Sequence, residues 1–157
     1  MISVRLARSD DNKFIEALGA RAAADTISAV RSSAPQVAAA SFRRLLFFCK
    51  ERMGTVMFVA DEDGERAGFL MLLTDVPDDP TQLPQAFVAF VAVEEQRRGR
   101  GIGRALVRAA EREARRRDLP HLSLMVGSHN EPARALYASE GFQPERILMT
   151  KPLSAAR

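Results

Sequence analysis

The stretch VAVEEQRRGRGIGRAL, residues 91–106, decides the fold expected for this chain. It joins the end of an apolar run to three glycines at alternate positions, 99, 101 and 103, with arginines on both sides. A glycine inside regular structure costs about 0.5–1 kcal/mol relative to alanine, so this cluster needs a structural reason. Glycines let backbone N–H groups approach a diphosphate closely, and a following helix directs its positive end toward the same charge. A tight strand-to-helix turn is the alternative explanation, and the loop alone leaves both open.

The spacing of the glycines excludes two common phosphate-binding loops. A dinucleotide fingerprint requires G-x-G-x-x-G/A, but its last position falls on Arg104 when counted from Gly99 and on Leu106 when counted from Gly101. A P-loop requires G-x-x-x-x-G-K-[ST], and the chain contains no Gly-Lys pair. Arg98, Arg100 and Arg104 are spaced to add charge-assisted hydrogen bonds at the rim of a bound anion.

Length and composition indicate one ordinary globular domain. The chain has 157 residues, of which 46% are hydrophobic and 27% charged, so we expect a single domain over residues 1–157. The first residues carry charges where a signal peptide has an apolar core, and the longest apolar run, residues 86–93, is much shorter than the ~20 residues of a membrane span. The single cysteine, Cys49, follows apolar neighbours and is interpreted as a core residue. We therefore expect a cytoplasmic protein that does not enter a membrane.

The net positive charge is small, but the arginines are concentrated in one segment of the chain. The isoelectric point is about 9.6 although the formal net charge is only +3, and nine arginines lie in the segment from Arg97 to Arg117. Such a local field attracts a polyanion, either a nucleic acid or a phosphorylated cofactor. The helix expected over residues 101–117 has no aromatic side chain for base stacking, so a nucleic-acid-binding module shows only part of its usual signature. A solvated helix face is the simplest alternative.

Periodicity and turn residues predict a mixed α/β (α+β) domain. Alternation of apolar and polar residues indicates strands, and Asp63-Gly64 indicates a hairpin. Helical spacing indicates one helix that is capped by the side chain of Asp10 or Asp11 and a second helix that begins at Pro35. Three prolines mark residues 74–85 as a loop. The strands are expected at residues 2–7, 55–60, 67–73, 86–93, 121–126 and 146–153, and the later helices at 101–117 and 132–140.

Two motifs resemble the GNAT superfamily of N-acetyltransferases. Residues 98–103 fit the family's acyl-coenzyme A signature, [QR]-x-x-G-x-[GA], and NEPARALYASEGF, residues 130–142, is similar to the family's Asn, Ala, Tyr and Gly-Phe positions. The order of the expected elements is similar as well. This resemblance implies a GNAT-like domain over residues 1–157, with a central mixed, mostly antiparallel sheet and helices on both faces.

The resemblance also implies an activity, a co-substrate and a set of site residues. The expected reaction is acetyl transfer from acetyl-CoA to a primary amine of a small molecule or peptide, by direct attack in a ternary complex. Tyr137 would be the general acid that protonates the departing thiolate, and Asn130 would contact the cofactor. The main chain of Val91, Ala92 and Val93 would bind the pantetheine arm. The pyrophosphate would be held by the main chain of Arg98, Gly99, Arg100, Gly101, Ile102, Gly103 and Arg104.

Several of these roles have structural alternatives. Asn130 is also suited to cap the helix that follows it, and Tyr137 to be a core residue with a satisfied hydroxyl. N-terminal-acetylating members of the family carry a glutamate at the position of Met125, and methionine cannot accept a proton. The nearest acids, Glu94 and Glu95, are expected to face solvent, so no general base is predicted and a water-relayed proton path is preferred.

The acceptor and the partners are the least defined features. In this family the acceptor site is shaped by regions that match residues 25–40 and 74–85, where Asp75, Asp78 and Asp79 would either attract an amine or form turns. The two histidines lack metal-ligand spacing, so no metal is expected. A non-catalytic acyl-CoA-binding regulatory domain remains a rival hypothesis, and the oligomeric state, a homodimer included, is left open.

Overall fold

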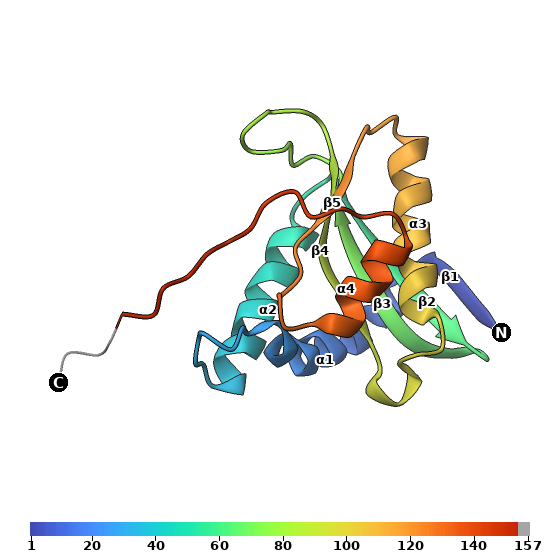
Figure 1. Cartoon of the computed structure of the whole chain (residues 1–157). Coiled ribbons are helices and arrows are strands. Elements are labelled where there is room, and N and C mark those ends of the chain that lie inside the picture. The colour runs from blue at the N-terminus through green and yellow to red at the C-terminus, as the bar shows by residue number, and fades with distance from the viewer. Residues whose placement is uncertain (154–157) are drawn as a thin grey trace.

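The structure is a computed structural model that describes residues 1–153; residues 154–157 lie outside the description. It confirms the expected fold class, a mixed sheet with helices on both faces (Figure 1). The strands are β1 (Ile2–Leu6), β2 (Thr55–Glu62), β3 (Glu65–Leu73), β4 (Ala86–Val93) and β5 (Leu122–Leu124). The helices are α1 (Asn12–Ala22), α2 (Pro35–Lys50), α3 (Ile102–Arg116) and α4 (Glu131–Ser139), with short 3-10 turns η1 (Ser9–Asp11), η2 (Ala23–Thr26) and η3 (Glu95–Arg97).

The sheet keeps its strands in chain order, and one pair is parallel. β1, β2, β3 and β4 are antiparallel neighbours, whereas β4 and β5 run parallel because α3 connects them. The two-residue turn between β2 and β3 confirms the predicted hairpin. Asp63 and Gly64 both have positive φ, 53° and 84°, which is the backbone that a tight hairpin turn requires and that an Asp-Gly pair adopts readily.

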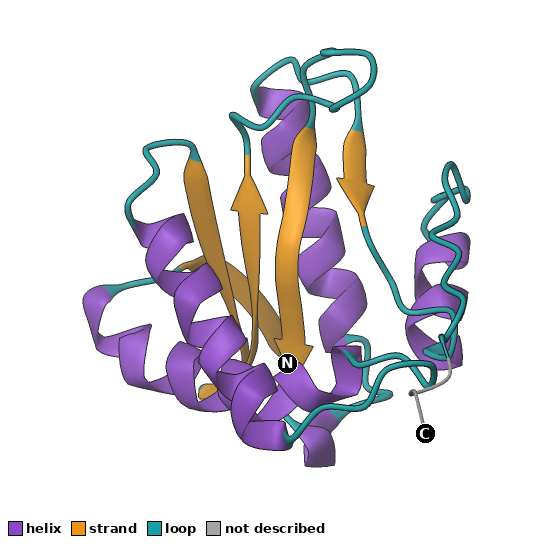
Figure 2. Cartoon of the chain, turned by 90° about the vertical axis from the view of Figure 1, so that its left-hand side faces the viewer, coloured by secondary structure: helices purple, strands orange, loops and turns teal. Residues whose placement is uncertain are grey.

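Two helix layers enclose the sheet (Figure 2). Phe69 and Met71 of β3 pack in one apolar cluster with α1 and α2, while Leu70 and Leu72 pack in a second cluster with α3. β3 is therefore the strand that is buried on both faces. β4 lies beside it, and much of its second half is only partly buried. Among residues 1–153, no helix is long and apolar enough to cross a membrane.

The predicted strand over residues 146–153 is wrong. No residue from Glu140 to Leu153 belongs to a helix or a strand, and the segment runs past β5 and out beyond the body of the molecule (Figure 1). Alternating apolar residues give a chain the pattern of a strand, but a strand also needs a hydrogen-bonding neighbour, which this segment lacks in the described chain. The strand expected over residues 121–126 is likewise shorter, ending at Leu124.

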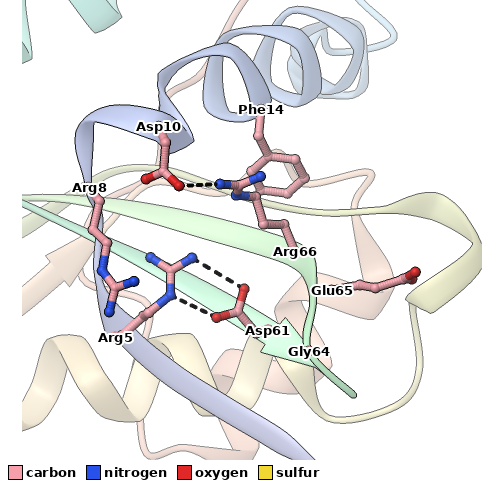
Figure 3. Close-up of a pocket in the computed structure, with 8 residues that line it drawn as sticks. All are labelled: Arg5, Arg8, Asp10, Phe14, Asp61, Gly64, Glu65 and Arg66. Carbon is pink, nitrogen blue, oxygen red and sulfur yellow. Dashed lines mark hydrogen bonds and ion pairs between the residues drawn. The ribbon is translucent and has the colours of Figure 1, made fainter.

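A buried ion cluster, which the sequence did not predict, joins the start of the chain to the β2–β3 hairpin. Neither Asp10 nor Asp11 caps α1 through its side chain, which corrects the predicted role. The side chain of Asp11 is instead fully buried and accepts hydrogen bonds from Arg5 (2.7 Å) and Arg66 (2.6 Å). Hydrogen bonding to the Arg5 guanidinium holds the pKa of Asp11 far below its usual range. Figure 3 shows the neighbouring pocket, where Asp10 pairs with Arg66 and Arg5 pairs with Asp61.

Candidate functional site

The sheet opens between β4 and β5. The two strands pair only at Ala86–Leu122, Phe87–Ser123 and Val88–Leu124, although β4 continues to Val93. A bulge lies just beyond the last of these pairs: Leu72 is opposite Val88 and Met71 is opposite Phe90, so Ala89 has no partner in β3. The second half of β4 therefore has a neighbouring strand on its β3 side only.

Alternation along β4 determines which backbone groups face this opening. The N–H of Glu94 donates to the carbonyl of Ala67 in β3 at 2.9 Å. In an antiparallel pair the next residue turns its polar groups the other way, so Val93 and Val91 direct theirs away from β3. The guanidinium Nε of Arg98 donates to the Val93 carbonyl at 3.4 Å, consistent with that direction. Two of the predicted pantetheine contacts thus face the opening, whereas the polar groups of Ala92 face β3.

A run of backbone N–H groups without acceptors lies at the start of α3. Gly99 and Gly101 have φ of 77° and 90°, a conformation that other L-residues rarely adopt, and Gly101 is the N-cap of the 15-residue helix. Within residues 1–153, nothing accepts a hydrogen bond from the N–H groups of residues 99–104, and no side chain caps the helix. The positive end of α3 adds to the field of these amides, which makes the loop a natural anion site.

The third glycine of the loop has a different role. A Cβ atom on Gly103 would lie 3.2 Å from Cδ2 of Leu136, tighter than ordinary van der Waals contact. Gly103 therefore lets α4 pack closely against the first turn of α3. The explanation of the glycine cluster as a tight strand-to-helix turn is confirmed, because Gly99 and Gly101 supply backbone conformation and Gly103 supplies close packing.

Each rim arginine already has a carboxylate partner from another segment of the chain. Arg98 pairs with Asp25 at 3.1 Å, Arg100 with Glu62 at 3.3 Å, and Arg104 with Glu140 at 2.7 Å. The three arginine side chains are 46–56% exposed, so water screens the pairs and competes with them. An incoming anion can exchange with these carboxylates or share the guanidinium with them.

Asn130 is the N-cap of α4 and Tyr137 lies on this helix, which packs against the start of α3. The Oδ1 atom of Asn130 accepts from the Ala133 N–H at 3.3 Å, which confirms its capping role. Tyr137 is 8% exposed, and its ring meets Phe142 edge-on at 5.7 Å between centroids. Its hydroxyl has no hydrogen-bond partner among residues 1–153, yet it is not sealed from solvent. Burial raises the pKa of the Tyr137 phenol.

Acidic and basic side chains near the opening contact one another across different elements. Glu94 is paired with Arg21 of α1 at 2.9 Å rather than free in solvent. The Nε2 atom of His129 lies 3.1 Å from the carbonyl oxygen of Asp25, the residue whose carboxylate binds Arg98. Arg21 was not predicted as part of the site, and Asp25 was included only as the first residue of the expected acceptor region, since no local pattern distinguishes either of them from other surface charges.

Other predicted residues occupy ordinary positions. Met125 is largely exposed and lies just after the end of β5. Both histidines are exposed, and Cys49 is fully buried, as expected of a core residue. In the loop over residues 74–85, Asp75 pairs with Arg52, and Asp78 binds Thr81 and Arg146. Turn formation and internal pairing therefore account for these two carboxylates.

Comparison with known proteins identifies the family. Residues 24–142 match the model of the Acetyltransferase (GNAT) family. The match covers more than half of the chain, which therefore belongs to the GNAT acetyltransferases, a family that uses acetyl-CoA. The chain is 36% identical over 77 residues to the uncharacterized N-acetyltransferase YycN of Bacillus subtilis, a match that covers 49% of this chain and 48% of that relative. The chain spans less than two thirds of the length of the curated relatives it matches.

Solved structures share the fold over almost the entire chain. A putative acetyl transferase from Pyrococcus furiosus superposes with a TM-score of 0.80 at 22% identity, covering 98% of this chain and 100% of that one. The structure of AAC(6')-Iy in complex with the bisubstrate analog CoA-S-monomethyl-acetylneamine superposes with a TM-score of 0.66 at 17% identity, covering 98% and 99% of the two chains. At these identities the likeness concerns the fold alone.

Proposed function

We propose that this chain transfers the acetyl group of acetyl-CoA to a primary amine by direct attack in a ternary complex, with Tyr137 as general acid. One observation carries the proposal. The open half of β4 leads directly into the N–H groups of residues 99–104, so a strand edge and an anion-binding loop follow each other along one path. A ligand that combines amide groups with a diphosphate, as coenzyme A does, matches that order.

The cofactor contacts follow from the direction of the backbone groups. The pantetheine amides would bind Val91 and Val93 as an added strand, while Ala92 supports the arm from within the sheet. The pyrophosphate would lie on the N–H groups of residues 99–104, because the N–H of Arg98 already donates to the Glu95 carbonyl at 3.3 Å. The side chains of Arg98, Arg100 and Arg104 would add charge at the rim, and Asn130 would contact the cofactor from the start of α4.

The chemistry needs positioning, stabilisation of charge and transfer of two protons. Binding both reactants turns attack on the thioester into an effectively unimolecular step. A β4 N–H, from Val91 or Val93, is a candidate donor to the oxygen that gains charge in the tetrahedral transition state. Tyr137 would give its proton to the departing thiolate. Its raised pKa suits an acid, since the phenol keeps its proton at neutral pH.

The attacking amine must lose a proton, since an alkylamine has a pKa near 10.4. Glu94 is paired with Arg21, and Met125 has no acidic group, so neither supports a carboxylate base. We therefore keep a water-relayed path to solvent. A carboxylate-like limb in the pH–rate profile, removed by one acid substitution, would contradict this path.

Two alternatives fit the structure less well. In a nucleic-acid-binding module the arginines of α3 would be accompanied by aromatic side chains for base stacking, and α3 contains none. A regulatory domain that binds acyl-CoA without turnover would share the cofactor site but would not need a phenol with an unused hydroxyl. The acceptor is proposed only as a primary amine of a small molecule or peptide, bound near residues 25–40 and 74–85.

Replacement of Tyr137 by phenylalanine tests the proposal. We expect Tyr137→Phe to lower kcat for thiol release about 10²–10⁴-fold, because general acid catalysis typically contributes that much. Stabilisation by acetyl-CoA should persist in this variant, at about 5–10 °C in the melting temperature when the ligand is at 100 times its dissociation constant. The matched control is Phe142→Leu, which alters the packing of the same ring but leaves the hydroxyl in place.

Assays with a panel of amines identify the acceptor and separate the alternatives. A thermal shift with acetyl-CoA but no thiol release from any amine would favour the regulatory domain. A shift with RNA and none with acetyl-CoA would favour the nucleic-acid-binding module. Unchanged turnover in Tyr137→Phe would remove Tyr137 from the mechanism.

A further inference from the structure

The sheet ends at β1 in an edge that has no neighbouring strand. β1 is the first strand in the sheet order and pairs only with β2 in the described part of the chain (Figure 1). Just after β1, the Ala7 N–H donates to the Met57 carbonyl of β2 at 2.8 Å. Alternate residues of an antiparallel strand direct their backbone groups to opposite sides, so Ile2 and Val4 direct theirs away from β2. Unpaired N–H and C=O groups on such an edge are a template for another strand.

A groove lies between this edge and helix α3. Ile2 and Val4 line it from β1, and residues from Gly101 to Arg112 line it from the helix. The groove therefore follows about 16 Å of α3, roughly the rise of eleven helical residues. The side chains of Ile2 and Val4 turn toward α3, where they pack against the apolar core and are only partly buried. An unpaired backbone edge and one face of a helix thus border the same groove.

Three arginines of α3 give the groove its positive charge. Arg104, Arg108 and Arg112 all line it, and they recur every fourth residue, so they lie along one face of the helix. Arg104 and Arg108 share the carboxylate of Glu140, but 46% and 58% of their side chains stay exposed. Arg112 is exposed and forms no ion pair within residues 1–153. No acidic residue lines the groove, which therefore favours a ligand with several negative charges.

The spacing of these arginines matches that of alternate residues in a strand. Residues four apart in a helix are about 6 Å apart along its axis, and residues two apart in a strand are about 6.6 Å apart. A strand added beside β1 would turn every second side chain toward α3, as Ile2 and Val4 do, and a carboxylate at each such position would meet one guanidinium. β1 has no acidic residue, so a second copy of this edge would not supply the carboxylates. A nucleic acid has no peptide groups for the edge, and the groove has no aromatic side chain for its bases.

We propose that the groove between β1 and α3 binds an extended acidic segment of a partner protein, which adds a strand to the β1 edge and places alternate Asp or Glu side chains against Arg104, Arg108 and Arg112. In recognition of this kind the main-chain hydrogen bonds supply affinity and the alternate side chains supply specificity. The proposal does not depend on acetyl transfer, since the groove lies on the opposite side of the sheet from the opening between β4 and β5.

Fluorescence anisotropy with a synthetic peptide tests the groove. The probe is a labelled, end-blocked peptide in which glutamate alternates with threonine, and the full chain should bind it saturably. Arg112→Glu should weaken binding about tenfold, because an attractive contact becomes a repulsive one. The matched control is Arg44→Glu, the same change at an exposed arginine of α2 in the other helix layer, which should alter the affinity only slightly. Circular dichroism checks that both variants keep their fold. Equal weakening by the two changes would overturn the proposal.

Methylation of the peptide backbone distinguishes strand addition from attraction of charge alone. In an antiparallel pairing the glutamates that face α3 also direct their N–H groups toward β1, so N-methylation of the glutamates should abolish binding and N-methylation of the threonines should preserve it. A parallel pairing reverses these two results. A peptide of the same composition with its glutamates grouped at one end should bind more weakly than the alternating one. Equal affinities of the two methylated peptides, tighter binding of a single-stranded RNA of the same charge, or no binding of the alternating peptide contradicts strand addition.

Discussion

Two arginine clusters in this molecule use the same side chain for different purposes. Arg5 and Arg66 surround the fully buried carboxylate of Asp11, whereas the side chains of Arg98 and Arg100 near the start of α3 are more than half exposed in their ion pairs. A buried pair is costly to break because a charge is left without a partner, while an exposed pair exchanges readily with water or with a ligand. The first cluster therefore supports the fold, and the second is available for binding. The exposure of the arginine side chains, 26–37% in the first cluster and 51–56% in the second, separates the two rather than the number of arginines.

The largest expected effect comes from breaking the buried cluster. Asp11→Asn should lower the free energy of unfolding by about 3–5 kcal/mol, since two guanidinium groups lose their common counter-charge. Denaturant unfolding measures this loss, and kcat should be unchanged under conditions where the variant is folded. The matched control is Asp10→Asn, the same change at the neighbouring, exposed carboxylate, which should alter stability only slightly. Equal losses in the two variants would contradict a difference based on burial.

The buried cluster also predicts the response to acid. The pKa of Asp11 is lower in the folded chain than in the unfolded chain, so its stabilising contribution is complete above about pH 4 and is lost as the pH falls below that. Pairing with Arg116 and Arg117 lowers the pKa of Glu113 to about 2. Glu113 therefore also loses its stabilising contribution as the pH falls. We expect the difference in unfolding free energy between the wild type and Asp11→Asn to shrink from pH 5 to pH 2, as measured by urea titration at each pH. A constant difference would show that the charge of Asp11 is not its source.

Removal of a cation from the exposed cluster should affect binding more than folding. Arg98→Ala should weaken acetyl-CoA binding about tenfold, the equivalent of one screened charge-assisted hydrogen bond, with little change in the melting temperature. Isothermal titration measures the affinity, and the effect should decrease as salt is added. Arg112→Ala is the control, because Arg112 lies on α3 two turns beyond the loop and forms no ion pair within residues 1–153. Equal weakening by both changes would indicate a general field instead of a local contact.

The smallest expected effect comes from removing the carboxylate partner of Arg98. Asp25→Asn removes the carboxylate that binds Arg98 in the free chain, so acetyl-CoA should bind about two- to fivefold more tightly. The same titration detects this change. Weaker binding would instead mean that Asp25 holds Arg98 in the orientation the cofactor needs.

Local patterns predicted most of the fold. The β2–β3 hairpin was found from Asp63-Gly64 and the alternation on either side, and α3 from the glycines at its start and the spacing of its apolar residues. These features depend on residues close together in the sequence. The same holds for the Asn130 cap.

Features that depend on distant residues were missed or misjudged. Asp11 was expected to cap a helix, because nothing in its local sequence shows that Arg66 lies beside it in the fold. An apolar run does not predict that one side of β4 is open, because the opening results from the early end of β5. Residues 146–153 have the pattern of a strand without a neighbour in the described chain, and sequence periodicity carries no information about the neighbour.

The chain contains one tyrosine and no tryptophan, so Tyr137 dominates its ultraviolet emission. Excitation near the phenol band therefore reports on a single position, without labels or added probes. Quenching on addition of acetyl-CoA, followed by stopped flow, gives the rates of cofactor arrival and departure at that ring. Few proteins of this size supply so selective an optical signal from a residue that is itself the proposed acid.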